Sequence, residues 1–187
     1  MERPEWQKHG GGMGEEVCLI TGATSGIGKA TAMGLASMGA SVVMVGRDRG
    51  RGEAAMAEIR GKSANASVDL LLADLSSQEE IHRLADVFKE SYPRLDVLIN
   101  NAGVIRSKRI MTADGIEMTF AVNHLAYFLL TKVLLDVLKA SAPSRIVNVA
   151  SGEQRNATID FDDLQGEKGY KGAKAYSQSK LANVLFT

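Results

Sequence analysis

The sequence predicts an α/β fold in which helices cover a parallel sheet. Short apolar runs alternate with segments that have the apolar spacing of helices, which is typical of successive βαβ units. A glycine-rich turn follows the first run, and polar residues follow the later ones. The 187 residues, with 45% hydrophobic and 24% charged side chains, indicate one globular domain.

The elements follow in a regular order along the chain. Strands are expected at 17–21, 41–45, 68–72, 96–99 and 145–149. Helices are expected at 26–38 and 49–60, from a cap at Ser76 or Ser77 to residue 92, at 115–139, and from 175 onward. Right-handed crossovers then favour the doubly wound, Rossmann-type strand order 3-2-1-4-5. Such sheets bind ligands beyond the carboxyl ends of their strands, so site residues are expected directly after strands.

Composition excludes several classes of protein. Lysine plus arginine and aspartate plus glutamate both number 22, so no general attraction to nucleic acid is expected. Cys18 is the only cysteine, and its apolar neighbours indicate a small buried hydrophobe in a reducing compartment. No apolar run is long enough to span a bilayer and no signal-peptide core is visible, so a cytoplasmic location is expected. No cluster has metal-ligand spacing, and we interpret His82 and His124 as surface or packing residues.

A phosphate-binding turn is predicted after the first strand. Its spacing is G-x-x-x-G-x-G, and it lies between a strand and a helix. Glycines let the backbone approach a pyrophosphate closely, and a helix N-terminus offers free N–H groups to that anion. A purely structural glycine turn is the alternative. The candidate cofactor contacts here are Gly22, Thr24, Ser25, Gly26, Ile27 and Gly28.

The end of the second strand bears on the choice of cofactor. Sites for NAD place an acidic residue there, whereas this strand ends in Gly46-Arg47-Asp48. The guanidinium of Arg47 suits the 2′-phosphate of NADP(H), which is therefore favoured over NAD(H). In the alternative, Arg47 is a solvated loop residue and Asp48 binds the ribose. Asp74 and Leu75, after the third strand, are candidates for the adenine, although Asp74 could equally be a helix N-cap.

A proton donor is predicted near the C-terminus. Tyr176 and Lys180 share one helix face at i and i+4, and an ammonium beside a phenol lowers the pKa of the phenol from about 10. Such a phenol is a usable general acid and base. Tyr170 and Lys174 have the same spacing, but Gly169 and Gly172 indicate a loop or a frayed helix start there. Tyr176 is therefore the predicted donor.

Together these motifs resemble the short-chain dehydrogenases/reductases. The matching pieces, in the order and spacing of that family, are 21–28, Asp74-Leu75, 100–103 (which holds Asn101, Ala102 and Gly103), Asn123, Ser151, and Tyr176 with Lys180. The segment 162–167 and the helix after it look most like the retinol dehydrogenase-like branch. The resemblance implies that Ser151 binds the substrate oxygen and that Tyr176 donates the proton. It also implies that Lys180 lowers the pKa of Tyr176 and holds the nicotinamide ribose. Asn123 would anchor a water that relays protons to Lys180. Asn123 bonded to backbone is the alternative.

The expected protein is an oxidoreductase that moves hydride between NADP(H) and an aldehyde, ketone or alcohol, with an apolar, retinoid-like substrate. A non-catalytic NADP-binding regulatory protein is the alternative. Residues 1–14 are expected to be a flexible lead-in, and 15–187 a dinucleotide-binding and catalytic domain. Because members of the family continue beyond the Tyr176 helix, we expect C-terminal strands to be missing and the fragment to be a poor enzyme. A homo-oligomer is expected of the full-length protein.

Overall fold

A parallel sheet forms the centre of the molecule. The computed structural model describes residues 12–14 and 16–187, so most of the expected lead-in, 1–14, lies outside the described residues. All pairings between neighbouring strands are parallel, and the strand order is β3-β2-β1-β4-β5, as predicted. The strands are β1 (Val17–Thr21), β2 (Ser41–Gly46), β3 (Val68–Leu72), β4 (Val97–Asn100) and β5 (Arg145–Asn148).

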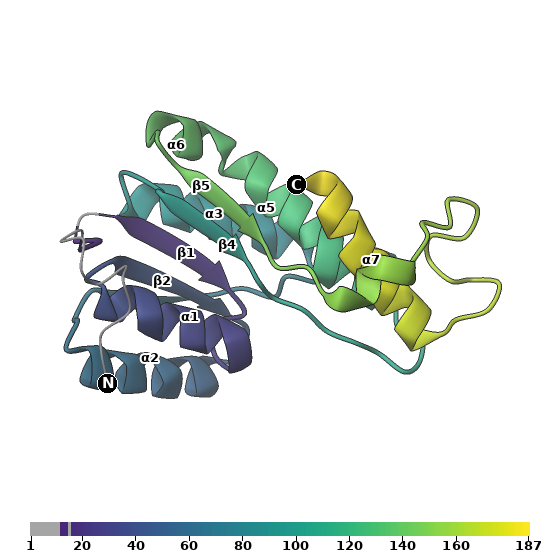
Figure 1. Cartoon of the computed structure of the whole chain (residues 1–187), viewed down its shortest axis with the longest axis horizontal. Helices are drawn as coiled ribbons and strands as arrows, with labels where there is room; N and C mark the ends of the chain where they lie inside the picture. Colours follow the sequence, from purple (N-terminus) through teal and green to yellow (C-terminus); the bar gives the residue numbers. More distant parts are fainter. Residues whose placement is uncertain (1–11, 15) are drawn as a thin grey trace.

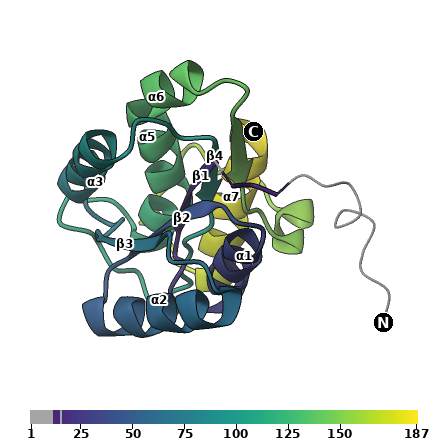
Figure 2. The same cartoon turned by 90° about the vertical axis from the view of Figure 1, so that its left-hand side faces the viewer.

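Helices cover both faces of this sheet (Figures 1 and 2). On one face, α1 (Gly26–Ser37) and α2 (Arg49–Ser63) pack on an apolar cluster that includes Cys18, Ile20 and Met44. On the other face, α3 (Gln78–Ser91), α5 (Ala126–Val133) and α6 (Leu135–Ala140) pack on a cluster around Leu19 and Leu98. Alternate residues of β1 thus face opposite layers, which explains why the strand is apolar throughout.

Side chains at the helix starts set where two of these elements begin. Asp48 Oδ1 accepts a hydrogen bond from the backbone N–H of Arg51 at 2.9 Å and caps α2. Ser77, not Ser76, caps α3, because its Oγ accepts from the N–H of Glu80 at 3.3 Å. Cys18 is fully buried, and burial raises the pKa of its thiol to about 12, so it behaves as an inert core residue.

The predicted helix 115–139 is interrupted, and that expectation of one continuous helix is wrong. It consists of a single turn α4 (Met118–Phe120), a π-helical turn η2 (Ala121–Leu125), then α5 and α6. The π turn surrounds Asn123, whose carbonyl accepts a hydrogen bond from Asn183 Nδ2 at 2.8 Å in α7 (Gly172–Phe186). An apolar periodicity does not reveal one widened turn, and such turns are frequent at functional sites. None of the described helices is both long and apolar enough to cross a membrane.

Candidate active site

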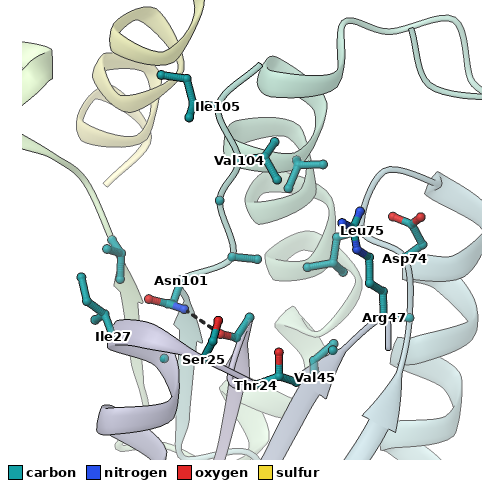
Figure 3. Close-up of a pocket in the computed structure, with 18 of the residues that line it drawn as sticks. Thr24, Ser25, Ile27, Val45, Arg47, Asp74, Leu75, Asn101, Val104 and Ile105 are labelled. Carbon is teal, nitrogen blue, oxygen red and sulfur yellow. Dashed lines mark hydrogen bonds between the residues drawn. The ribbon is translucent and has the colours of Figure 1, made fainter. Parts of the chain in front are cut away.

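A cavity of about 830 Å³ opens at the carboxyl ends of the strands. That volume lies within the usual range for small-molecule and cofactor sites. Of the predicted site residues, only Gly26 and Asn123 do not line it. Figure 3 shows part of the lining. The lining residues among those predicted are Gly22, Thr24, Ser25, Ile27, Gly28, Arg47, Asp74, Leu75, Asn101, Ala102, Gly103, Ser151, Tyr176 and Lys180.

The glycine turn packs directly against the loop that follows β4. Gly22 has φ +67°, and a Cβ atom there would lie 2.8 Å from Ala102 Cα. A Cβ atom at Gly28 would overlap the side-chain amide of Asn101. Gly26, with φ +53°, shapes the turn without lining the cavity. These positions therefore need glycine, for backbone conformation or for close approach.

The first turn of α1 has N–H groups available for an anion. Ser25 is the N-cap residue in extended conformation, and its side chain makes no capping hydrogen bond. The first N–H groups of a helix have no partner within the helix. Because Ser25 and Gly28 both line the cavity, this helix end fits a pyrophosphate.

Thr21 holds two residues of the cavity wall, Asn101 and Ala102, a role that sequence reasoning missed. Its Oγ1 accepts hydrogen bonds from the N–H groups of Asn101 at 2.9 Å and Ala102 at 3.0 Å. Asn101 also donates from its side chain, because its Nδ2 binds the carbonyl of Thr21 at 2.8 Å. The ends of β1 and β4 are thereby joined through side chains as well as through the sheet.

Two guanidinium groups line the cavity beyond β2. Arg47 lies beside Asp74 and Leu75, across from Thr24 (Figure 3). Arg51, in the first turn of α2, is a second lining arginine that the sequence analysis did not single out. Asp48 is a residue type that often caps helices, so the sequence could have placed Arg51 in the first turn of the helix after β2, near the predicted cofactor site. The carboxylate of Asp48 already accepts a hydrogen bond from the backbone N–H of Arg51. This hydrogen bond is the main reason why the pKa of Asp48 is lowered.

Asp74 is also partly engaged by its own turn. Its Oδ1 accepts from the N–H of Ser76 at 2.9 Å and from the Ser76 hydroxyl at 2.8 Å. The helix cap that was its alternative role belongs to Ser77. Asp74 and Leu75 therefore stay at the cavity wall, where a cofactor could contact them.

Tyr176 and Lys180 lie one turn apart on α7 and both line the cavity. Lys180 is 3% exposed, and its Nζ lies 5.9 Å from the centre of the Tyr176 ring. The ammonium donates a hydrogen bond to the Val149 carbonyl at 2.8 Å. Burial lowers the pKa of Lys180 to about 8. Ser151, beyond the end of β5, lines the same cavity, and its Oγ accepts a hydrogen bond from the N–H of Glu153 at 3.3 Å.

Tyr170 lies outside α7 and does not line this cavity. Its hydroxyl donates to the buried carboxylate of Glu117 at 2.9 Å and lies 3.2 Å from Thr119 Oγ1. Lys174 instead pairs with Asp160 at 2.8 Å. Tyr170 and Lys174, the other pair with the Tyr-x-x-x-Lys spacing, therefore make structural contacts away from the cavity.

Asn123 connects the β4 loop to α7. Its Nδ2 donates to the Val104 carbonyl at 2.9 Å and to Ser179 Oγ at 3.0 Å, and its Oδ1 accepts from the Val104 N–H at 2.7 Å. Both amide hydrogens thus bind protein groups, which corresponds to the backbone-bonded alternative. The arrangement holds the cavity wall at Val104 in register with the helix that carries Lys180.

Within the described residues, no group of three or more His, Cys, Asp or Glu side chains could hold a metal ion. His124 instead lies with Nδ1 3.1 Å from Asn183 Oδ1. The cavity thus offers a glycine turn, a helix N-terminus and two arginines at one part, and a hydroxyl, a phenol and an ammonium at another. This combination suits a phosphorylated dinucleotide and a proton transfer.

Known proteins are similar to this chain in sequence and in fold. The family model for the short chain dehydrogenases matches residues 16–187. Human retinol dehydrogenase 13 is 49% identical over 170 residues, which cover 90% of this chain and 51% of that protein. The chain therefore spans about half the length of that relative.

Solved structures agree. A protein from Mycobacterium paratuberculosis is 38% identical, with a TM-score of 0.80 over 92% of this chain and 60% of that one. A metagenomic short-chain oxidoreductase in complex with NADP is 28% identical, with a TM-score of 0.77 over 94% and 74%. With its sheet order, glycine turn and Tyr176–Lys180 pair, the chain belongs to the short-chain dehydrogenase family and is similar there to the retinol dehydrogenases.

Proposed function

We propose that this chain carries the cofactor site and the catalytic residues of an NADP(H)-dependent oxidoreductase that interconverts a carbonyl compound and an alcohol. The observation that carries the proposal is one cavity lined both by Arg47, after β2, and by Ser151, Tyr176 and Lys180. Strands β1 and β4 lie between β2 and β5, so the cavity spans several strands and can accept an extended ligand. When bound, the nicotinamide would supply the hydride for reduction of a carbonyl compound and accept it in oxidation of an alcohol.

The chain's own residues supply the proton chemistry. In the reducing direction, the Ser151 hydroxyl hydrogen-bonds the substrate oxygen, and the Tyr176 hydroxyl gives that oxygen its proton as negative charge develops there. The Lys180 ammonium, 5.9 Å from the Tyr176 ring, stabilises the phenolate that is left. Asn123 keeps the Val104 wall and α7 in register through its side-chain amide.

NADP(H) is the proposed cofactor because of charge. Arg47 and Arg51 both line the cavity beyond β2, and the Asp48 carboxylate is engaged with the backbone of Arg51. Guanidinium groups bind phosphate through charge-assisted hydrogen bonds. The solved relative in complex with NADP supports the same choice.

An apolar substrate of the retinoid kind is proposed from two observations. Val104, Ile105 and Val122 contribute apolar side chains to the cavity, and Ile105 is 60% exposed. An exposed isoleucine at a cavity wall offers an apolar surface for a ligand. The similar proteins are named retinol dehydrogenases. The cytoplasmic location and the homo-oligomer expected above stay predictions, which cell fractionation and light scattering test.

The deciding experiment compares binding with turnover. The full-length gene product is titrated with NADPH and NADH, and loss of NADPH absorbance is followed with retinal, other aldehydes and ketones. We expect NADPH to bind more tightly and at least one apolar carbonyl compound to be reduced. Tight NADPH binding with no reduction across the panel would favour the regulatory alternative.

A further inference from the structure

A second tyrosine lies beside the catalytic lysine. Tyr127, in α5, is 1% exposed, and its ring centre lies 5.6 Å from Lys180 Nζ. Its hydroxyl donates a hydrogen bond to the Ala102 carbonyl at 2.8 Å. Tyr127 itself does not line the cavity, and its position in an apolar helix gave no sequence signal.

The ammonium of Lys180 needs such a neighbour. Lys180 is 3% exposed, and none of the ion pairs formed by the described residues includes it. Its contacts are the Val149 carbonyl and the rings of Tyr127, from α5, and Tyr176, from its own helix. A buried cation without a carboxylate is costly, and an aromatic face within about 6 Å compensates part of that cost.

The Tyr127 hydroxyl contacts the part of the cavity wall that is proposed to bind the cofactor. Ala102 belongs to the loop after β4 that packs on Gly22. Thr21, at the end of β1, binds the N–H of Ala102, and Tyr127, in the helix layer, binds its carbonyl. One side chain thus contacts both the cofactor loop and the lysine that serves the proton donor.

We propose that Tyr127 is a positioning residue that couples the two halves of the site: its ring supports the ammonium of Lys180, and its hydroxyl holds the cofactor loop at Ala102. The proposal rests on the proposed function and deepens it. It assigns the two effects to different atoms of one side chain, so they can be separated.

The hydroxyl is tested by Tyr127→Phe, which keeps the ring. We expect NADPH affinity to fall about three- to tenfold, because the buried carbonyl of Ala102 loses its donor. The proton affinity of Lys180 should stay within twofold of wild type. Lys132→Gln, a change at an exposed residue of the same helix, is the control and should alter neither quantity.

The ring is tested by comparing Tyr127→Phe with trifluorophenylalanine incorporated at position 127. Fluorine withdraws electron density from the ring face and changes the shape little, so both forms should fold and show cooperative melting. The proton affinity of Lys180 is read from the pH dependence of its acetylation by acetic anhydride, with detection by mass spectrometry. We expect the proton affinity of Lys180 to be about two- to fivefold lower in the fluorinated form. The pH profile of turnover should shift in the same direction.

Equal acetylation profiles in the two forms would overturn the role of the ring. Unchanged NADPH affinity in Tyr127→Phe would overturn the role of the hydroxyl. The acetylation needs no turnover. A wild-type protein that reduces no carbonyl compound therefore refutes the proposed function, while an altered Lys180 profile still supports the coupling.

Discussion

The methyl group of Thr24 occupies the space in which a side chain at position 46 would begin. A Cβ atom built at Gly46 would overlap Thr24 Cγ2, and both residues line the cavity. The phosphate-binding turn and the end of β2 thus constrain each other. An acidic residue that would bind the ribose of NAD cannot simply be placed at position 46.

This contact predicts that Gly46→Asp alone is a poor route to NAD specificity. We expect it to weaken NADPH binding, with overpacking against Thr24 of about 1–3 kcal/mol, and to gain no NADH affinity. The double variant Thr24→Gly, Gly46→Asp should bind NADH more tightly than either single variant. Dissociation constants for both cofactors, measured by calorimetry, check this. Equal NADH affinity in the single and double variants would show that Thr24 excludes nothing.

The two arginines should read the phosphate. Arg47→Ala is expected to weaken NADPH binding by about 1.5–3 kcal/mol and to leave NADH binding nearly unchanged, because a charged hydrogen bond is lost. Arg51→Ala should act in the same direction, since Arg51 lines the same part of the cavity. Titration with both cofactors is the measurement. If both cofactors weaken equally, Arg47 does not read the phosphate, and Asp48 becomes the residue to test for ribose binding.

The two tyrosines with a lysine four residues later should behave differently. Tyr176→Phe should lower turnover about 100- to 10,000-fold with little change in NADPH affinity, because it deletes the proton donor alone. Tyr170→Phe should keep turnover but lower the free energy of unfolding by about 1–3 kcal/mol, since the buried Glu117 carboxylate loses a donor. Steady-state rates and denaturant melts check both. A greater loss of turnover at Tyr170 would exchange the two assignments.

Lys180 should make stability depend on pH. Burial lowers the pKa of Lys180 from 10.5 to about 8, so between these values the unfolded chain binds more protons than the folded one. The free energy of unfolding should therefore rise as the pH rises from about 8 towards 10.5. Below pH 8 both states carry the proton, and the folded state bears the cost of burying it.

The measurement compares wild type with Lys180→Met. Across that interval the difference in unfolding free energy between the two should change by roughly 1–3 kcal/mol, an estimate that allows for incomplete burial. The methionine variant should be the more stable form at neutral pH. A constant difference across the interval would mean that Lys180 titrates as in the unfolded chain.

Much of the fold follows from local properties of the sequence. Strands buried on both faces must be apolar throughout, so β1 and β2 are visible as short apolar runs. The handedness of βαβ crossovers then determines the strand order. Site residues could be expected because ligands of such sheets bind beyond the strand ends, and most of those expected do line one cavity.

The remaining features depend on contacts between residues far apart in the chain. The apolar pattern of 115–139 does not show the π turn at Asn123, because Asn183, sixty residues later, holds that carbonyl. Likewise, Thr24 meets Gly46 and Tyr127 reaches Ala102 only once the strands and helices have packed. Local spacing determines which elements form and which residues follow them. Packing determines which side chains meet, because hydrogen bonds and steric overlap act across distances of a few ångströms in space.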